Sequence, residues 1–103
     1  QLKLIPIQDV RYFQADQKYV CVHHAGGQDL IDDSLKSLEE EFAGDFVRIH
    51  RGVVVAVARI ERVAKSSDGK HEVVLRDGSQ PPENELIISR RHLADVRRRL
   101  KGG

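Results

Sequence analysis

Several protein classes are excluded by what this sequence lacks. Its 103 residues include one cysteine, no tryptophan, no methionine and three prolines, and only 5% of them are aromatic. Because the single cysteine, Cys21, cannot form an internal disulfide, the disulfide-stabilised secreted class is excluded, and we expect Cys21 to be a small buried side chain in a reducing compartment. With so few aromatic residues, the core must come mainly from valine, isoleucine, leucine and alanine.

Long apolar stretches are missing too. No stretch approaches the ~20 apolar residues that cross a bilayer, and no charged start followed by an apolar middle marks a signal peptide. We therefore expect a soluble, cytoplasmic protein with no membrane partner. The chain opens with Gln1 rather than Met and enters a strand pattern at once, so we expect residues 1–103 to be one domain of a longer protein.

A large net charge is also absent. There are 17 Lys and Arg residues against 16 Asp and Glu, which gives a net charge of only +1, so the total does not indicate a nucleic-acid partner. The distribution is uneven, however: residues 29–45 hold seven acidic residues and one lysine, whereas residues 89–101 hold six basic residues and one aspartate. A domain with two such sides can present the basic one to a polyanion.

Strand patterns dominate the first third of the chain. Short runs rich in β-branched and aromatic residues alternate with turn residues at Pro6 and at residues 15–17 and 26–27. The predicted strands cover residues 2–5, 9–13, 18–22 and 29–31. Later in the chain, a hairpin of residues 59–64 and 72–75 is predicted, and a strand over residues 86–88 follows a loop that contains two adjacent prolines.

Two helices are predicted by apolar side chains three and four residues apart. Ser34 is the expected N-cap of the first, which ends at Gly44 as a C-cap and faces inward through Leu35, Leu38 and Phe42. Ser89 is the expected cap of the second helix, which faces inward through Leu93, Val96 and Leu100.

The centre of the sequence is residues 46–55, where a strand pattern runs through charged residues into a run of valines. Because strand side chains alternate, Arg48 and His50 share one face and the intervening apolar residues share the other. Gly52 predicts a bend or bulge where backbone can approach a ligand. Arg48, His50 and Arg51 together suit an anion with several acceptors, such as phosphates or guanine edges, although exposed arginines also simply keep small sheets soluble.

Four separated blocks resemble the LytTR DNA-binding domain in their order and spacing, and the resemblance covers nearly the whole chain. The blocks are residues 15–20, 34–40, 46–51 and 89–93. The opening Ile5-Pro6 and the ending Ser89-Arg90-Arg91-His92 look like the branch of that family that contains the alginate-biosynthesis regulators.

The resemblance implies a mostly β fold with a minor α component, in which antiparallel strands accompany one helix in the middle and one at the C-terminus. It also implies the C-terminal effector domain of a bacterial two-component response regulator, attached behind a phosphorylatable receiver domain. Such domains regulate transcription by binding double-stranded DNA with loops, which enter two successive major grooves and bend the duplex. A dimer on DNA is expected when the receiver is attached, and no cofactor is implied.

Matched position by position, the resemblance implies base contacts from Lys18, Tyr19, Arg51 and Arg91. Arg51 and Arg91 suit guanine best, because a guanidinium group can donate two hydrogen bonds to O6 and N7 in the major groove. Other side chains suit phosphates, which set the register of a protein on the duplex. These candidates are Arg48, His50, Ser89, Arg90 and His92.

Two other functional classes compete with DNA binding. An enzyme is suggested by five histidines, but no His-x-x-x-His, Cys-x-x-Cys or Glu-x-x-His spacing appears, so we expect no catalytic residues and no metal. A small-ligand or protein-interaction β-module, such as a receptor for cyclic dinucleotides of the PilZ type, is the alternative. The Arg-x-x-x-Arg and Asp/Asn-x-Ser-x-x-Gly motifs of that type are missing.

Overall fold

The structure, a computed structural model, describes residues 4–79 and 81–102. In chain order its elements, with η for a 3-10 helix, are η1 (Ile7–Asp9), β1 (Val10–Asp16), β2 (Tyr19–His24), β3 (Gly27–Ile31), α1 (Leu35–Glu41), β4 (Phe46–His50), β5 (Val53–Ala56), η2 (Val57–Arg59), β6 (Ile60–Lys65), β7 (His71–Leu75), β8 (Ile87–Ile88) and α2 (Arg90–Lys101). The predicted fold class, mostly β with one helix in the middle and one at the C-terminus, is confirmed.

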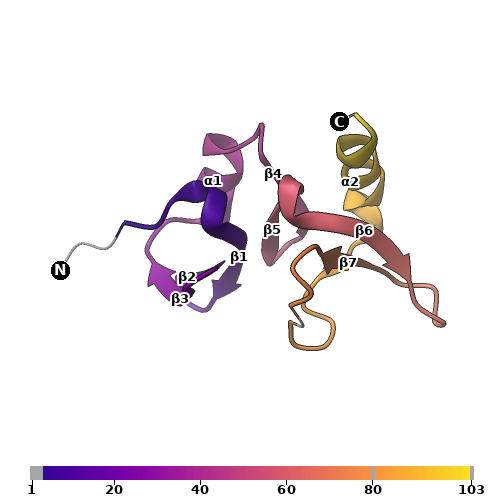
Figure 1. Cartoon of the computed structure of the whole chain (residues 1–103), viewed down its shortest axis with the longest axis horizontal. Helices are drawn as coiled ribbons and strands as arrows, with labels where there is room; N and C mark the ends of the chain where they lie inside the picture. The colour runs from indigo at the N-terminus through magenta and orange to yellow at the C-terminus, as the bar shows by residue number, and fades with distance from the viewer. Residues whose placement is uncertain (1–3, 80, 103) are drawn as a thin grey trace.

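The strands form two sheets in which all neighbours are antiparallel. The first sheet has the order β3-β2-β1-β5-β4 and the second has the order β6-β7-β8. Figure 1 shows the first sheet with α1 in one half of an elongated molecule and the second sheet with α2 in the other half. The molecule measures 45 × 27 × 25 Å.

The first sheet has a hydrophobic core on each of its faces. On one face α1 covers a cluster that includes Leu35, Leu38, Phe13, Phe46 and Val54. On the other face the second sheet and α2 cover a cluster that includes Tyr12, Ile49, Ile60, Leu86 and Val96. Because successive strand residues point to opposite faces, β5 needs apolar residues at every position, and all four of its residues are buried. This explains the unbroken valine run.

The first helix begins where the sequence predicts and ends earlier. The Ser34 hydroxyl oxygen accepts a hydrogen bond from the Ser37 N–H at 3.0 Å, which confirms the N-cap. The prediction that Gly44 is the C-cap is wrong, because α1 ends at Glu41 and Phe42 is the C-cap residue. The chain turns there because the Phe42 ring packs beside Phe13 and Phe46, with ring centroids 6.4 and 5.8 Å apart.

The N-terminal prediction is also corrected. In the strand predicted over residues 2–5, residues 2 and 3 lie outside the described part of the chain, and Leu4 and Ile5 are not in a strand. Pro6 is instead the N-cap residue of η1, and the Asp9 N–H donates to the Pro6 carbonyl at 2.9 Å, so β1 starts only at Val10. Proline is compatible with a first helical turn because its missing N–H has no partner there.

The remaining elements agree with the pattern. The β6–β7 hairpin and the short strand β8 are present, and Cys21 is buried. In α2, Val96 is fully buried, while Leu93 and Leu100 are partly buried against the same cluster. Ser89 occupies the N-cap position, but its side chain makes no capping bond to the helix backbone. Among the described residues, no helix is long and apolar enough to cross a membrane.

Candidate nucleic-acid interface

Three connections that carry predicted DNA-contact residues meet at one end of the first sheet. The β1–β2 turn consists of Gln17 and Lys18, and the β4–β5 turn consists of Arg51 and Gly52. They lie next to each other because β1 pairs with β5, and the Ala15 N–H donates to the Gly52 carbonyl at 2.9 Å.

The first turn of α2 joins them through a backbone contact. The Ser89 N–H donates to the Ile49 carbonyl oxygen at 2.9 Å, which places the start of α2 beside the end of β4. Arg51 and Arg91 each lie two residues further along the chain from one of the two bonded residues. Both side chains are exposed.

A β-bulge in β4 separates Arg48 from His50. Arg48 pairs with Val54 and His50 pairs with Val53, so Ile49 is an extra residue in β4. Directly paired residues share a face, which puts Arg48 on the α1 side and His50 on the side of the second sheet. The prediction that Arg48 and His50 share one face is therefore wrong.

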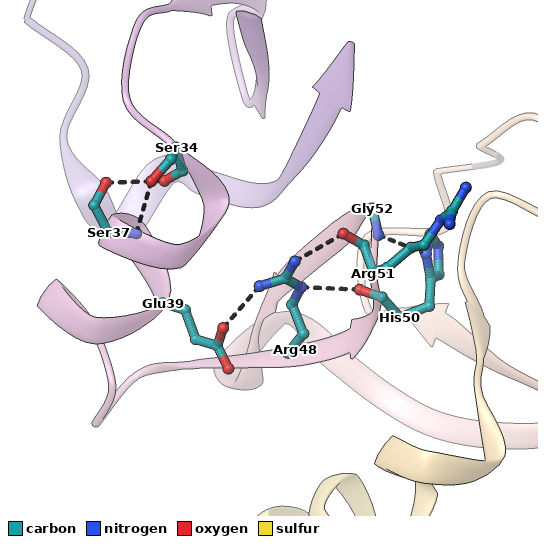
Figure 2. Close-up of polar contacts among 7 residues, drawn as sticks. All are labelled: Ser34, Ser37, Glu39, Arg48, His50, Arg51 and Gly52. Carbon is teal, nitrogen blue, oxygen red and sulfur yellow. Dashed lines mark hydrogen bonds and ion pairs between the residues drawn. The ribbon is translucent and has the colours of Figure 1, made fainter. Parts of the chain in front are cut away.

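The guanidinium group of Arg48 is occupied by contacts within the protein. Its Nη1 donates to the Glu39 carboxylate at 2.8 Å, its Nε donates to the His50 carbonyl at 3.0 Å and its Nη2 donates to the Arg51 carbonyl at 2.7 Å. Figure 2 shows this side chain between α1 and the β4–β5 turn, with the Arg51 side chain directed away from it. Arg48 thus links α1 to the backbone of the turn.

The His50 ring holds the same turn from the other side. Its Nδ1 accepts a hydrogen bond from the Gly52 N–H at 3.0 Å, so its Nε2 carries the proton and donates to the Glu85 carbonyl at 2.9 Å. A Cβ atom at Gly52 would lie 3.2 Å from His50 Cε1, so a larger residue would push the ring away. The same arrangement occurs at the opposite end of the sheet, where the Gly26 N–H donates to His24 Nδ1 at 3.1 Å.

Glu85 docks the loop between β7 and β8, which contains Pro81 and Pro82, onto the first sheet. Its carboxylate accepts hydrogen bonds from the Tyr12 hydroxyl and, at 2.7 Å, from the Gln14 side-chain amide. Burial, together with the hydrogen bond to Glu85, raises the pKa of Tyr12 well above its usual value. The loop therefore ends against the β4–β5 turn. The sequence carries no local signal for this, since Glu85 and His50 are 35 residues apart.

The start of α2 contains a further internal contact. The Ser89 hydroxyl and His92 Nδ1 are hydrogen-bonded at 2.7 Å. Partial burial of His92, followed by the nearby charges of Arg91 and Arg48, lowers the pKa of this imidazole. Its neutral form is therefore favoured near pH 7. Within the described ranges, no cluster of three or more His, Cys, Asp or Glu side chains could hold a metal ion.

A family model of the LytTr DNA-binding domain matches residues 1–101. The chain belongs to the LytTR family. It is 46% identical over 99 residues to the positive alginate biosynthesis regulatory protein of Pseudomonas aeruginosa, and the match covers 94% of this chain and 38% of that protein. An uncharacterized response regulatory protein of Vibrio cholerae is 31% identical over 75 residues, which cover 68% of this chain and 29% of the relative. The chain thus spans less than two fifths of the length of these relatives.

A solved structure shares the LytTR fold. The LytTr DNA-binding domain of a Bacillus cereus protein superposes with a TM-score of 0.76 over 96% of this chain and 86% of the other, at 22% sequence identity. The expected resemblance to the LytTR domain and to its alginate-regulator branch is confirmed by these comparisons.

The contacts divide the predicted LytTR contact residues into two groups. One group is exposed, and within residues 4–79 and 81–102 no hydrogen bond or ion pair engages its side chains: Lys18, Tyr19, Arg51, Arg90 and Arg91. The other group is partly buried and hydrogen-bonded within the domain: Arg48, His50, Ser89 and His92. Glu85, which connects to this second group through His50, was not predicted.

Proposed function

We propose that this domain binds double-stranded DNA sequence-specifically, as the output domain of a bacterial two-component transcriptional regulator. One observation carries the proposal: two strand turns and the first turn of α2 lie next to one another and expose cationic side chains that make no hydrogen bond or ion pair within residues 4–79 and 81–102. Membership of the LytTR family supports the same partner. The domain needs no catalytic residue or cofactor for this role.

Arg51 and Arg91 are the proposed readers of guanine. Each guanidinium group is exposed and makes no hydrogen bond in the described part of the chain, so it can donate two parallel hydrogen bonds to O6 and N7, a pattern found only in the major groove. Lys18 on the neighbouring turn and Tyr19 at the start of β2 are proposed to contact bases as well. Arg90 is the first residue of α2 and is the proposed phosphate contact.

The internal contacts of Arg48, His50, Ser89 and His92 favour positioning roles over the phosphate contacts expected from the sequence. Arg48 and His50 each bond to the backbone of the β4–β5 turn, and Ser89 and His92 bond to each other. A binding loop that is rigid before it meets DNA loses less conformational entropy on binding. These residues would therefore raise affinity without touching DNA.

We propose that the domain belongs to a longer, dimeric regulator in the cytoplasm. The Vibrio cholerae relative is named a response regulatory protein, and both relatives extend well beyond the matched region. We propose that a receiver domain precedes this domain and that dimers bind DNA. Two domains on one face of the duplex would then require half-sites about one helical turn, ~34 Å, apart.

The test is selection of bound duplexes from a random library, followed by calorimetry. We expect a short enriched motif, tighter binding to that motif than to a scrambled duplex, and no heat from a cyclic dinucleotide. Equal binding to enriched and scrambled duplexes would remove the claim of sequence specificity. Binding of the cyclic dinucleotide in place of DNA would favour the small-ligand alternative.

A further inference from the structure

The loop that Glu85 docks carries an exposed amide side chain at the same end of the molecule. Asn84 precedes Glu85 and is exposed, and in the described ranges its side chain has no hydrogen-bond partner. Its φ is +69°, and the only other non-glycine residue with positive φ in the described part of the chain is Gln17, at φ +56°, in the β1–β2 turn. Such conformations are uncommon and often mark functional loops.

Asn84 lies across a small cleft from the β4–β5 turn. The cleft has a volume of about 210 Å³, and its walls include Gly52 and His50 on one side and Glu83 and Asn84 on the other. The proposed guanine reader Arg51 immediately precedes Gly52. Asn84 is therefore a near neighbour of the turn that presents Arg51.

The loop is held firmly enough to present one side chain in one direction. Glu85 bonds to Tyr12 and Gln14 through its carboxylate and to His50 through its carbonyl oxygen. The Glu85 N–H also donates to the Pro82 carbonyl at 3.1 Å, which closes a turn around Asn84. The restricted φ angles of Pro81 and Pro82 further limit the conformations open to the loop.

The negative charges in this loop favour contact with bases over contact with phosphates. The residues on either side of Asn84 are the carboxylates Glu83 and Glu85, which repel the DNA backbone. A neutral carboxamide between them offers one donor group and one acceptor. That pair matches N7 and N6 of adenine, to which asparagine makes two hydrogen bonds in the major groove.

We propose that Asn84 is an additional base-reading residue, which selects adenine beside the guanine read by Arg51. This inference rests on the proposed function, because it needs the β4–β5 turn to enter the major groove. It adds a specificity determinant from a loop that belongs to none of the sequence blocks carrying the LytTR resemblance.

The experiment compares sites selected from random duplexes by the wild type, Asn84→Gly and Asn84→Asp. Glycine tolerates the positive φ and removes only the side chain, whereas aspartate also tolerates it but can no longer donate to N7. We expect the wild-type motif to contain an adenine beside its Arg51-dependent guanine. Asn84→Gly should lose the preference for that adenine, about 5- to 150-fold against other bases, and Asn84→Asp should shift it toward cytosine, whose N4 amino group donates to carboxylates.

Other results would overturn the inference in distinguishable ways. If the wild type selects a motif and Asn84→Gly selects the same motif with the same preferences, Asn84 does not read a base and the proposed function stands. If Asn84→Gly weakens enriched and scrambled duplexes equally, Asn84 contacts phosphate and the inference is wrong. If the wild type enriches no motif, the proposed function fails and the inference fails with it. Thermal unfolding of each variant checks that the domain is folded.

Discussion

The Nη2 atom of Arg48 donates a hydrogen bond to the backbone carbonyl of Arg51 at 2.7 Å, so one arginine holds the turn that carries the other. The same guanidinium group reaches Glu39 on α1. The exposed end of the domain is thereby connected to the helix on its acidic side. Whether Arg48 touches DNA can be decided by the salt dependence of binding.

Arg48→Ala should weaken DNA binding without changing its salt dependence. Removing Arg48 frees the β4–β5 turn, but no phosphate contact is lost, so the slope of log affinity against log salt should match that of the wild type. Loss of the partly buried hydrogen bonds should also lower the free energy of unfolding by about 1–3 kcal/mol. Calorimetry at several salt concentrations and chemical denaturation measure the two effects.

Glu39→Gln is the matched control for Arg48→Ala. It removes the charge of the ion-pair partner but leaves an acceptor for Arg48 Nη1, so the turn should stay in place and DNA affinity should change little. A slope that flattens by about 0.9 in Arg48→Ala would instead identify Arg48 as a phosphate contact.

Gly52→Ala should lower both stability and DNA affinity, whereas Gly26→Ala should lower stability alone. In both variants the new Cβ meets a histidine ring, at 3.2 Å from His50 Cε1 and at 3.3 Å from His24 Cε1. Crowding of this kind costs about 1–3 kcal/mol. Of these two histidines, His50 and not His24 holds the turn that presents Arg51, so of the two variants only Gly52→Ala should weaken the complex.

Gly44→Ala controls for the loss of a glycine, because nothing lies within 4 Å of a Cβ built there. Thermal unfolding and a DNA titration of the three variants provide the comparison. Equal loss of DNA affinity in Gly26→Ala and Gly52→Ala would show that general destabilisation, and not the position of the turn, is responsible.

Acidification below pH 6.5 should destabilise the domain through His23 and His92. Burial lowers the pKa of His23, and burial with the charges of Arg91 and Arg48 lowers the pKa of His92, both from a usual value of 6.5. As pH falls, the unfolded chain therefore binds these two protons at a higher pH than the folded domain does. The stability contributed by the neutral rings is complete above pH 6.5 and is lost as pH falls from 6.5 through the folded-state pKa values.

Titration of the imidazole protons by NMR measures the two pKa values directly, and thermal unfolding between pH 5 and 8 measures the effect on stability. His23→Gln should make the thermal stability of the domain less dependent on pH, because one of the two titrating groups is removed. An imidazole of His23 or His92 that titrates at or above pH 6.5 would contradict the expectation.

Local patterns predicted most of the fold. Apolar spacing identified the inward faces of α1 and α2, and the β-branched run identified β5, because each signal depends on residues near in sequence. The predictions were wrong at positions where contacts with residues distant in sequence determine the structure. Phe42 ends α1 early because it packs against Phe13 and Phe46, and no spacing within the helix reports that contact.

The site shows the same division. Exposed cations on turns were predicted from short motifs, but the bulge at Ile49 depends on how β4 pairs with β5 and reverses the face that His50 occupies. Glu85 could not be identified because its partners, Tyr12, Gln14 and His50, are brought to it only by the tertiary fold.

The proposed base contacts and phosphate contacts should respond differently to mutation. Arg51→Ala and Arg91→Ala should each weaken binding to the enriched duplex by about 1–3 kcal/mol and relax the preference for one guanine, because each loses a two-hydrogen-bond contact to a base. Binding of these variants to a scrambled duplex should change much less.

Arg90→Ala is the comparison within the same helical turn. Loss of one phosphate contact should weaken enriched and scrambled duplexes alike and flatten the salt slope by about one unit. If Arg91→Ala behaved in this way too, Arg91 would be a phosphate contact. Base reading would then rest on the β4–β5 turn and its neighbours, and the first turn of α2 would serve only to orient the domain on the duplex.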